Sequence, residues 1–324
     1  MLRSSPSPVD EDDDVFIYRG GRAPLYVSHV LIDESVHEIQ DDAFDHCMNL
    51  LTVDTHDGIR KIGAHSFSWC GSLRQISLKS AVEVNEEAFY GCENLESVEF
   101  GVRLEIIGQH SFAWTLLTEL KLPSIITIGN HAFWNCKRLT DIELSERLET
   151  IGLYAFGECE RLQRIVVPLK RDLFQYSHYY QKYNQFHDCE QLTTVDLAGG
   201  IQKTVASLHM ESWRTETNTI INRINQVLPN TPANEKTDEI KRWMDLVIDK
   251  MDHYKSEHCR YVKEGITILE LALWKAKLGE KEEYAAEGKS KKAKVDSESA
   301  RKEGRITCGA DMVIKNVLPF LQLE

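Results

Sequence analysis

The stretch IGNHAFWNCKRLTDIEL, Ile128 to Leu144, decides the fold, because its skeleton of Ile-Gly, Ala-Phe, Cys, Leu and Ile recurs along most of the N-terminal two thirds of the chain. The repeated phenylalanines are separated by 23, 22, 23, 21, 23 and 30 residues. They are Phe44, Phe67, Phe89, Phe112, Phe133, Phe156 and Phe186. Such a period is typical of architectures in which each copy forms one unit and neighbouring copies stack. The sequence therefore predicts a solenoid.

Each copy contains three segments whose residue types have separate physical roles. An Ile-Gly pair, such as Ile62-Gly63, buries the isoleucine and uses glycine for a turn with unusual backbone angles. The Ala/Ser-Phe-x-x-Cys-x-x-Leu segment has apolar residues at helical intervals, which predicts a short helical turn with Phe, Cys and Leu facing the core. The Leu-x-x-Ile-x-Leu segment, such as Leu139 to Leu144, alternates as a strand does, and we expect these strands to stack in parallel about 4.8 Å apart.

These segments resemble the BspA-like subclass of leucine-rich repeats, whose consensus runs through the same Ile-Gly, Ala-Phe, Cys, Leu and Ile positions. Seven copies, within residues 36–198, carry the resemblance. It implies an α/β solenoid, curved and with a parallel sheet on one face. The family is best known for cell-surface adhesion and binding proteins, often secreted. The remaining third of the chain is similar, in a general way, to repeat proteins of diatoms.

Composition and charge limit the classes of partner. The chain has 324 residues, 42% of them hydrophobic, and a formal charge of -13, which disfavours nucleic acid and anionic membranes. No segment approaches the ~20 apolar residues that span a bilayer, and the N-terminus lacks an apolar stretch of signal-peptide length. We therefore expect a soluble, cytoplasmic protein. The nucleus stays open, because the lysines within residues 289–294 could form an import signal or could simply be solvated.

Six of the eight cysteines each lie three residues after a repeat phenylalanine. They are Cys47, Cys70, Cys92, Cys136, Cys159 and Cys189. A position fixed by the repeat phase is a packing position, and a free cysteine behaves there as a small hydrophobe. Thr115 occupies the same place in the fourth copy, which a disulfide or a metal site would not tolerate. We expect reduced core cysteines.

The segments before and within the solenoid differ in composition. Residues 1–14 combine Ser, Pro and an acidic run, which predicts a disordered tail. Residues 15–35 alternate apolar and polar positions around Gly20 and Gly21, which predicts a β-hairpin that caps the first repeat. The solenoid of residues 36–198 is interrupted in its last copy by an insertion at residues 169–185.

The repeat period ends at about residue 198. Residues 199–278 contain two amphipathic patterns separated by Pro229 and Pro232, which predicts an antiparallel helical hairpin. The second pattern is long enough for one extended helix or for two, and the hairpin is expected to cover the end of the solenoid. Residues 279–304 have the charged composition of a disordered linker. Residues 305–324 are apolar enough to predict a C-terminal docking helix.

The residues that flank the inward isoleucine of each strand should project from the concave face of the sheet. Candidate binding residues at these positions are Asp54, Glu99, Glu119, Lys121, Asp141, Glu143, Arg164 and Asp196. Stacked carboxylates repel one another unless a cation or a basic partner lies between them, so the pattern favours a positively charged protein partner. An acidic protein also has acidic residues on its solvated faces, and both interpretations stay open.

Two sets of aromatic residues are weaker candidates. The insertion holds Tyr176, Tyr179 and Tyr180, which could bind a partner or could pack the insertion onto its neighbours. Just after the repeat phenylalanines lie Trp69, Tyr90, Trp114 and Trp134, which could be rim packing or a recognition stripe.

Catalytic motifs are absent from the sequence: it contains no Gly-rich phosphate loop, Gly-x-Ser-x-Gly elbow, His-Glu-x-x-His or Cys-x-x-Cys. His65, His110 and His131 share one repeat phase, which is compatible with metal ligation in principle, but other residue types occupy that phase in other copies. We expect no catalytic residue, no metal and no cofactor.

The sequence favours a non-enzymatic scaffold that presents a leucine-rich repeat surface to a protein partner. In the alternative, the helical region self-associates or binds a partner helix through Trp243, Met244 and Met251, with the repeats as rigid support. The oligomeric state and the partner's identity are left open.

Overall fold

The structure is a computed structural model that describes residues 15–179 and 182–287. The chain divides into two compact units, residues 1–250 and 251–324. The first unit contains the solenoid and the helices that follow it, and the second begins within the last helix. The expected tail at residues 1–14, most of the expected linker and the expected docking helix at 305–324 lie outside the described residues.

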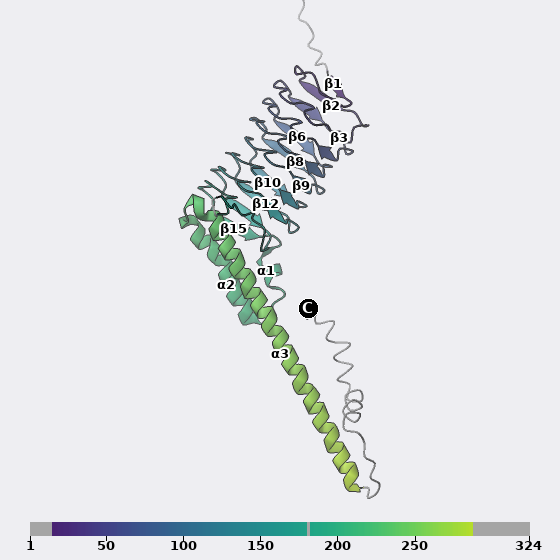
Figure 1. Cartoon of the computed structure of the whole chain (residues 1–324), viewed down its shortest axis with the longest axis vertical. Helices are drawn as coiled ribbons and strands as arrows, with labels where there is room; N and C mark the ends of the chain where they lie inside the picture. The colour runs from purple at the N-terminus through teal and green to yellow at the C-terminus, as the bar shows by residue number, and fades with distance from the viewer. Residues whose placement is uncertain (1–14, 180–181, 288–324) are drawn as a thin grey trace, which may run out of the picture. The chain divides into compact units, whose positions relative to one another are not determined.

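The solenoid is built on parallel strands, one or two from each copy, stacked along its length (Figure 1). The longer strands pair in three successive parallel sheets, in the orders β1-β2-β4, β6-β8 and β10-β12-β14-β15. Their bounds are β1 Val15–Tyr18, β2 His29–Ile32, β4 Thr52–Asp54, β6 Gln75–Leu78, β8 Ser97–Phe100, β10 Glu119–Leu122, β12 Asp141–Leu144, β14 Arg164–Val167 and β15 Thr194–Leu197. The parallel stacking predicted from the repeat is therefore confirmed.

Two-residue strands at the Ile-Gly segments form a second, six-stranded parallel sheet. They are β3 Glu38–Ile39, β5 Lys61–Ile62, β7 Glu83–Val84, β9 Ile106–Ile107, β11 Thr127–Ile128 and β13 Thr150–Ile151. The glycine that follows several of these strands lies very close to the backbone of the preceding copy and does not have a left-handed φ angle. A Cβ on Gly63 would lie 2.6 Å from the Ile39 carbonyl oxygen and from the Asp41 nitrogen of the preceding copy.

The repeat phenylalanines form one continuous stack through the core. Neighbouring rings lie 5.0 to 5.6 Å apart and within 10° of parallel, and all seven side chains are fully buried. Tyr18 extends the stack beyond Phe44, with ring centroids 4.9 Å apart. The predicted inward positions are confirmed.

The segment around each phenylalanine is not the helical turn that its apolar spacing predicted. The residues two before and two after most repeat phenylalanines have left-handed φ angles of 53° to 64°. These angles point alternate amide groups at the next copy, so that the Phe67 amide donates to the Ala88 carbonyl at 2.7 Å. The segment is therefore held by bonds between copies, which satisfy its buried backbone groups.

The predicted N-terminal β-hairpin is wrong. Strand β1 pairs with β2 in parallel, with Val15 opposite His29, and β2 pairs in the same way with β4. Gly20 and Gly21, with φ angles of 126° and 76°, do turn the chain. The chain then crosses the end of the solenoid and re-enters the sheet in the same direction, so β1 is the first rung of the stack.

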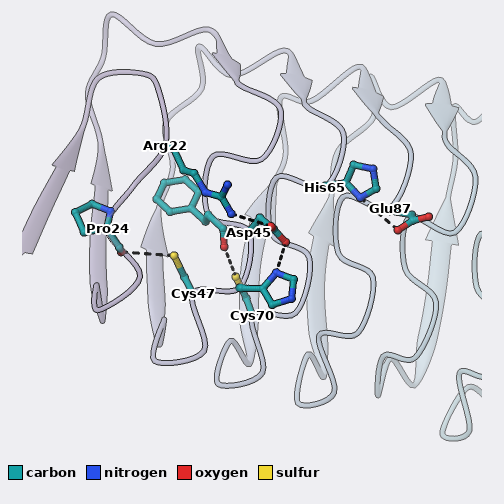
Figure 2. Close-up of polar contacts among 9 residues, drawn as sticks. Arg22, Pro24, Asp45, Cys47, His65, Cys70 and Glu87 are labelled. Atoms are coloured by element: carbon teal, nitrogen blue, oxygen red, sulfur yellow. Dashed lines mark hydrogen bonds and ion pairs between the residues drawn. The ribbon is translucent and has the colours of Figure 1, made fainter.

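The cysteine prediction is confirmed, since every cysteine among the described residues is free and the six repeat cysteines are buried. Each repeat thiol donates to a carbonyl of the preceding copy. Cys70 Sγ lies 3.1 Å from the Phe44 oxygen, and Cys47 Sγ lies 3.6 Å from the Pro24 oxygen (Figure 2). Burial raises the pKa of the Cys92 thiol to about 12, so this thiol is protonated and acts as a hydrogen-bond donor.

The last copy is followed by helices α1 Gly200–Val205 and α2 Glu211–Val227, the 3-10 turns η1 Leu228–Asn230 and η2 Ala233–Glu235, and α3 Lys236–Glu287. Helices α2 and α3 run antiparallel over the part of α3 before residue 251. Trp243 Nε1 donates to the Ile220 carbonyl at 3.2 Å, and Lys250 pairs with Glu216 at 2.6 Å. Helix α3 is one continuous helix, and it extends beyond residue 278, where a linker was expected to begin.

Lys236, at the start of α3, closes the end of the solenoid. Its buried Nζ donates to the carbonyls of Cys189, Glu190 and Leu192 at 3.0, 2.6 and 2.7 Å. The neighbouring Thr237 accepts the Phe186 amide at 3.0 Å. The helical region therefore satisfies backbone groups of the last copy that have no further copy to bond to.

Candidate functional site

The open β-face, defined as the outward side of β1, β2, β4, β6, β8, β10, β12, β14 and β15, carries all eight charged residues predicted from the strand pattern. Between them the inward side chains Leu120, Ile142 and Ile165 are buried. Glu119, Glu143 and the other predicted charged residues are exposed or half-exposed. The alternation along each short strand thus separates a core side from a solvent side.

Five of the eight residues meet at one hollow of about 210 Å³ over β10, β12 and β14. It is lined by Glu119, Leu120, Lys121, Asp141, Glu143 and Arg164. The parallel register places Glu119 opposite Asp141 and Lys121 opposite Glu143. Asp196 joins this group through Arg164, whereas Asp54 and Glu99 lie on the two other sheets.

Arg164 bridges two carboxylates that the strand pattern alone placed in an acidic ladder. Its Nη1 lies 3.0 Å from Asp141, and its Nε lies 2.8 Å from Asp196. Its hydrogen bond to Asp141 is the main cause of a raised pKa for Arg164; partial burial acts in the opposite direction, and the hydrogen bond to Asp196 adds to the rise. Both carboxylates therefore have an ion-pair partner within the protein, although the single guanidinium offsets only one of their two negative charges.

Glu99 is also compensated from within the chain. Lys79, which directly follows β6, pairs with the Glu99 carboxylate at 2.9 Å, and Ser77 Oγ donates to the same carboxylate at 3.3 Å. The hydrogen bond from Lys79 is the main cause of a lowered pKa for Glu99.

Glu119 and Glu143 differ from these carboxylates, because neither has an ion-pair partner among the described residues. Both side chains are exposed at the hollow, on neighbouring strands. The nearby Lys121 has no ion-pair partner there either. The hollow and Asp196 together hold four carboxylates against two cations, a formal charge of -2. Two carboxylates at this hollow are thus available to an external cation.

The insertion packs through Phe174, whereas Tyr176 and Tyr179 are exposed. Phe174 is buried, bridges to Ile151 in parallel, and lies edge-on to Phe186 with centroids 5.9 Å apart. Tyr179 is 97% exposed, and Tyr176 is partly exposed. Tyr180 lies outside the described residues. The packing interpretation therefore holds for Phe174 and fails for Tyr179.

The histidines of the shared repeat phase stack on one another instead of converging on a point. The rings of His110 and His131 are 4.6 Å apart and 12° from parallel, and Tyr154 stacks on His131 at 5.2 Å. Burial, and then the neighbouring His110, lower the pKa of His131. Over the residues that the structure describes, no group of three or more His, Cys, Asp or Glu side chains has the geometry to hold a metal ion.

Comparison with known proteins places this geometry in a family. The model of the BspA type leucine rich repeat region matches six copies, over residues 25–124, 61–184 and 105–237. The chain belongs to the BspA-type leucine-rich repeat family. Proteins built from leucine-rich repeats generally serve as protein-interaction scaffolds. No curated protein matches the chain.

Several solved structures are similar to this BspA-type chain, and two of them are described as leucine-rich repeat proteins. One from Bacteroides ovatus is 24% identical with a TM-score of 0.44, and the match covers 55% of this chain and 48% of that one. The T. pallidum leucine-rich repeat protein is 22% identical with a TM-score of 0.37, covering 56% and 72%. The pneumococcal vaccine antigen PcpA is 17% identical with a TM-score of 0.33, covering 56% and 65%. The chain thus spans about half the length of the Bacteroides ovatus protein.

No helix within the described residues combines the length and the apolar character needed to cross a membrane.

Proposed function

We propose that this protein is a non-enzymatic scaffold that binds a basic segment of a partner protein on its open β-face, at the hollow over β10, β12 and β14. The observation that carries the proposal is the pair of exposed carboxylates, Glu119 and Glu143, which no cation of the described chain neutralises. Lysine or arginine side chains of a partner would supply the missing charge.

The ion pairs around Arg164 support this assignment, because they fix the surroundings of the free carboxylates. Asp141 and Asp196 are held on either side of the guanidinium, so the strands present a fixed array of charges rather than mobile side chains. A rigid array reduces the entropy lost on binding. Lys121 would repel a cation placed directly above it, which restricts the positions that a basic segment can take.

The size of the face is also sufficient. Successive strands lie about 4.8 Å apart, so the four strands of the β10-β12-β14-β15 sheet cover about 15 Å along the stack. A segment running along the stack could reach both free carboxylates and continue over the preceding sheets.

Charge-reversal variants test the proposal. Capture of partners from cell extract is compared by quantitative mass spectrometry for the wild type, for Glu119→Lys with Glu143→Lys, and for Glu34→Lys with Glu93→Lys. The last pair changes the net charge equally at exposed positions outside the strands. We expect basic partners to be lost only from the first variant. Equal retention by all three proteins would refute the role of this face.

A second candidate function rests on exposed apolar residues of α3. Tyr261, Ile268, Leu269 and Leu271 are between 49% and 67% exposed. Such side chains suit association with another helix or with a second copy. Trp243 and Met244, which the sequence suggested for this task, are buried in the first unit and cannot carry it.

Sedimentation measurements test this second candidate. Self-association through α3 would raise the mass with protein concentration, and Ile268→Lys with Leu271→Lys would abolish the rise. Val102→Lys, at a 76% exposed position of the solenoid, is the matched control. A mass that is independent of concentration would exclude a second copy of the chain as the binding partner of α3.

A further inference from the structure

The solenoid carries a continuous line of aromatic rings on its turn side, away from the open β-face. Each ring centroid lies within 6.4 Å of another in the line, from the first copy to the seventh. This aromatic ribbon consists of His46, Trp69, Tyr90, His110, Trp114, His131, Trp134, Tyr154 and His187. It is separate from the phenylalanine stack, whose rings are fully buried.

Two tryptophans of the ribbon occupy backbone positions that do not favour them. Trp69 and Trp114 have left-handed φ angles of 59° and 64°. Bulky residues are uncommon in this region, whereas glycine and asparagine tolerate it. Gly91 and Asn135 occupy the same repeat position in other copies. The repeat can thus be built with small residues there, and folding alone does not require tryptophan.

The environment of Trp69 differs from that of a core aromatic. One side of its indole lies against Gly91, where an added Cβ would come within 2.7 Å of the ring. The side chain nevertheless remains 36% exposed, and that of Trp114 remains 41% exposed. Trp134 packs edge-on to Trp114 at 5.7 Å and lies over Gly157 in a similar way. These rings are supported by glycine or by aromatic edges and still present surface to solvent.

The spacing along the ribbon is regular because the backbone repeats. Phe67, Phe89 and Phe112, which belong to the same copies, step by 5.0 Å each. Trp69 and Trp114 are two copies apart, or about 10 Å along the stack. This distance is close to the length of two pyranose rings in an extended β-linked chain.

From these observations we propose that the aromatic ribbon binds a neutral β-1,4-linked glycan, with sugar rings stacked on Trp69 and Trp114. The axial C–H groups on one face of such a sugar pack against an aromatic ring, and its hydroxyls are left for the N–H and O–H groups at the ring edges. A linear array of exposed rings suits a linear polymer of flat units. The ribbon itself contains no Asp, Glu, Lys or Arg side chain, which favours a neutral ligand. Beside it, the Glu87 carboxylate lies 3.3 Å from the ring of His65 (Figure 2).

Cellohexaose and chitohexaose are the probes, titrated against intrinsic tryptophan fluorescence, with affinity electrophoresis in hydroxyethylcellulose as a second readout. Trp69→Asn with Trp114→Asn removes the two platforms and keeps the backbone, because Asn135 adopts a φ of 58° at the same repeat position. Tyr179→Asn, at a fully solvated ring outside the ribbon, is the matched control. Thermal unfolding confirms that each variant is folded.

We expect the wild type to bind at least one of the two oligosaccharides and the double variant to bind about tenfold more weakly. The Tyr179→Asn and the Glu119→Lys, Glu143→Lys proteins should bind as the wild type does, so failure of the open β-face proposal would not affect this result. Failure of the wild type to bind either probe would overturn the inference. So would equal binding by the double variant, or binding of decaproline in preference to both sugars, which would make the ribbon a peptide site.

Discussion

Replacing Lys236 by methionine should loosen the closed end of the solenoid. In the native protein its Nζ donates to three carbonyls of the last copy at 2.6 to 3.0 Å. Methionine has a similar length but no donor, so the buried carbonyls of Cys189 and Leu192 would lose their partner.

The size of the effect follows from two opposing contributions. Leaving a buried acceptor without a partner costs about 1–3 kcal/mol, and two such acceptors are at stake. Removing the ammonium also removes its desolvation penalty, which is the main cause of the lowered pKa of Lys236. We therefore expect the free energy of unfolding to fall by about 2–4 kcal/mol.

Urea unfolding, followed by circular dichroism, measures this change, and hydrogen exchange locates it. The amides of the last copy, including Phe186, should lose protection before those of the first. Lys203→Met is the matched control, because Lys203 pairs with Glu146 at 2.6 Å on the exposed surface and should contribute less than about 1 kcal/mol. If the two variants unfold at the same urea concentration, the reasoning about the closing lysine is refuted.

Three further predictions concern the repeats. Brief iodoacetamide treatment of the native protein should label Cys259 and leave Cys92 unlabelled, since Cys92 is buried and burial raises its pKa to about 12; labelling of both at one rate, detected by peptide mapping, would contradict this. Acid should destabilise the protein through His131, because its pKa is lower in the folded than in the unfolded state. The contribution of the neutral ring to the free energy of unfolding is complete above the ordinary pKa of about 6.5. It is lost as the pH falls through the lowered pKa. His131→Asn should flatten the dependence of the urea midpoint on pH between 7.5 and 5, and an unchanged slope would count against the assignment. Gly63→Ala should lower the free energy of unfolding by about 2 kcal/mol or more, because its Cβ would meet backbone atoms of the preceding copy at 2.6 Å. A melting temperature within a degree of the wild type would contradict this, because it would show that neighbouring copies move apart without cost.

The buried part of the solenoid could be predicted from the sequence because each core position recurs in every copy. Each phenylalanine, cysteine and leucine of the repeat occupies one phase, and a position shared by all copies can only be an inward one when it is apolar. The same reasoning predicted the reduced cysteines, because Thr115 occupies the cysteine position of one copy, which a disulfide or a metal site would not tolerate. In the structure the Thr115 hydroxyl donates to the Phe112 carbonyl at 2.9 Å.

The backbone path between buried positions was harder to predict. Apolar residues three apart are compatible with a helical turn and also with the left-handed turns that the structure has, since both place Phe and Cys inward. In the same way, the alternation in residues 15–35 fits parallel and antiparallel pairing equally. The direction of β2 depends on how the chain crosses the end of the solenoid after Gly21. The alternation of apolar and polar residues does not determine that path.

The candidate site was predictable in position but not in its pairing. The strand pattern places Arg164, Asp141 and Asp196 on one face, yet the two ion pairs depend on side-chain reach across the register. Lys236 had no signal at all, because a single lysine in a polar stretch before a helix is ordinarily solvated. Its role follows only from where α3 begins relative to the last copy.

The central claim, that Glu119 and Glu143 form a binding site for a basic segment, is tested most directly by fluorescence anisotropy with a labelled peptide of alternating lysine and serine. We predict that Glu119→Lys with Glu143→Lys weakens binding about tenfold, while Glu34→Lys with Glu93→Lys, which changes the net charge equally, has a much smaller effect. Equal weakening by the two variants would contradict the claim, because it would show that the peptide senses only the overall charge of the protein.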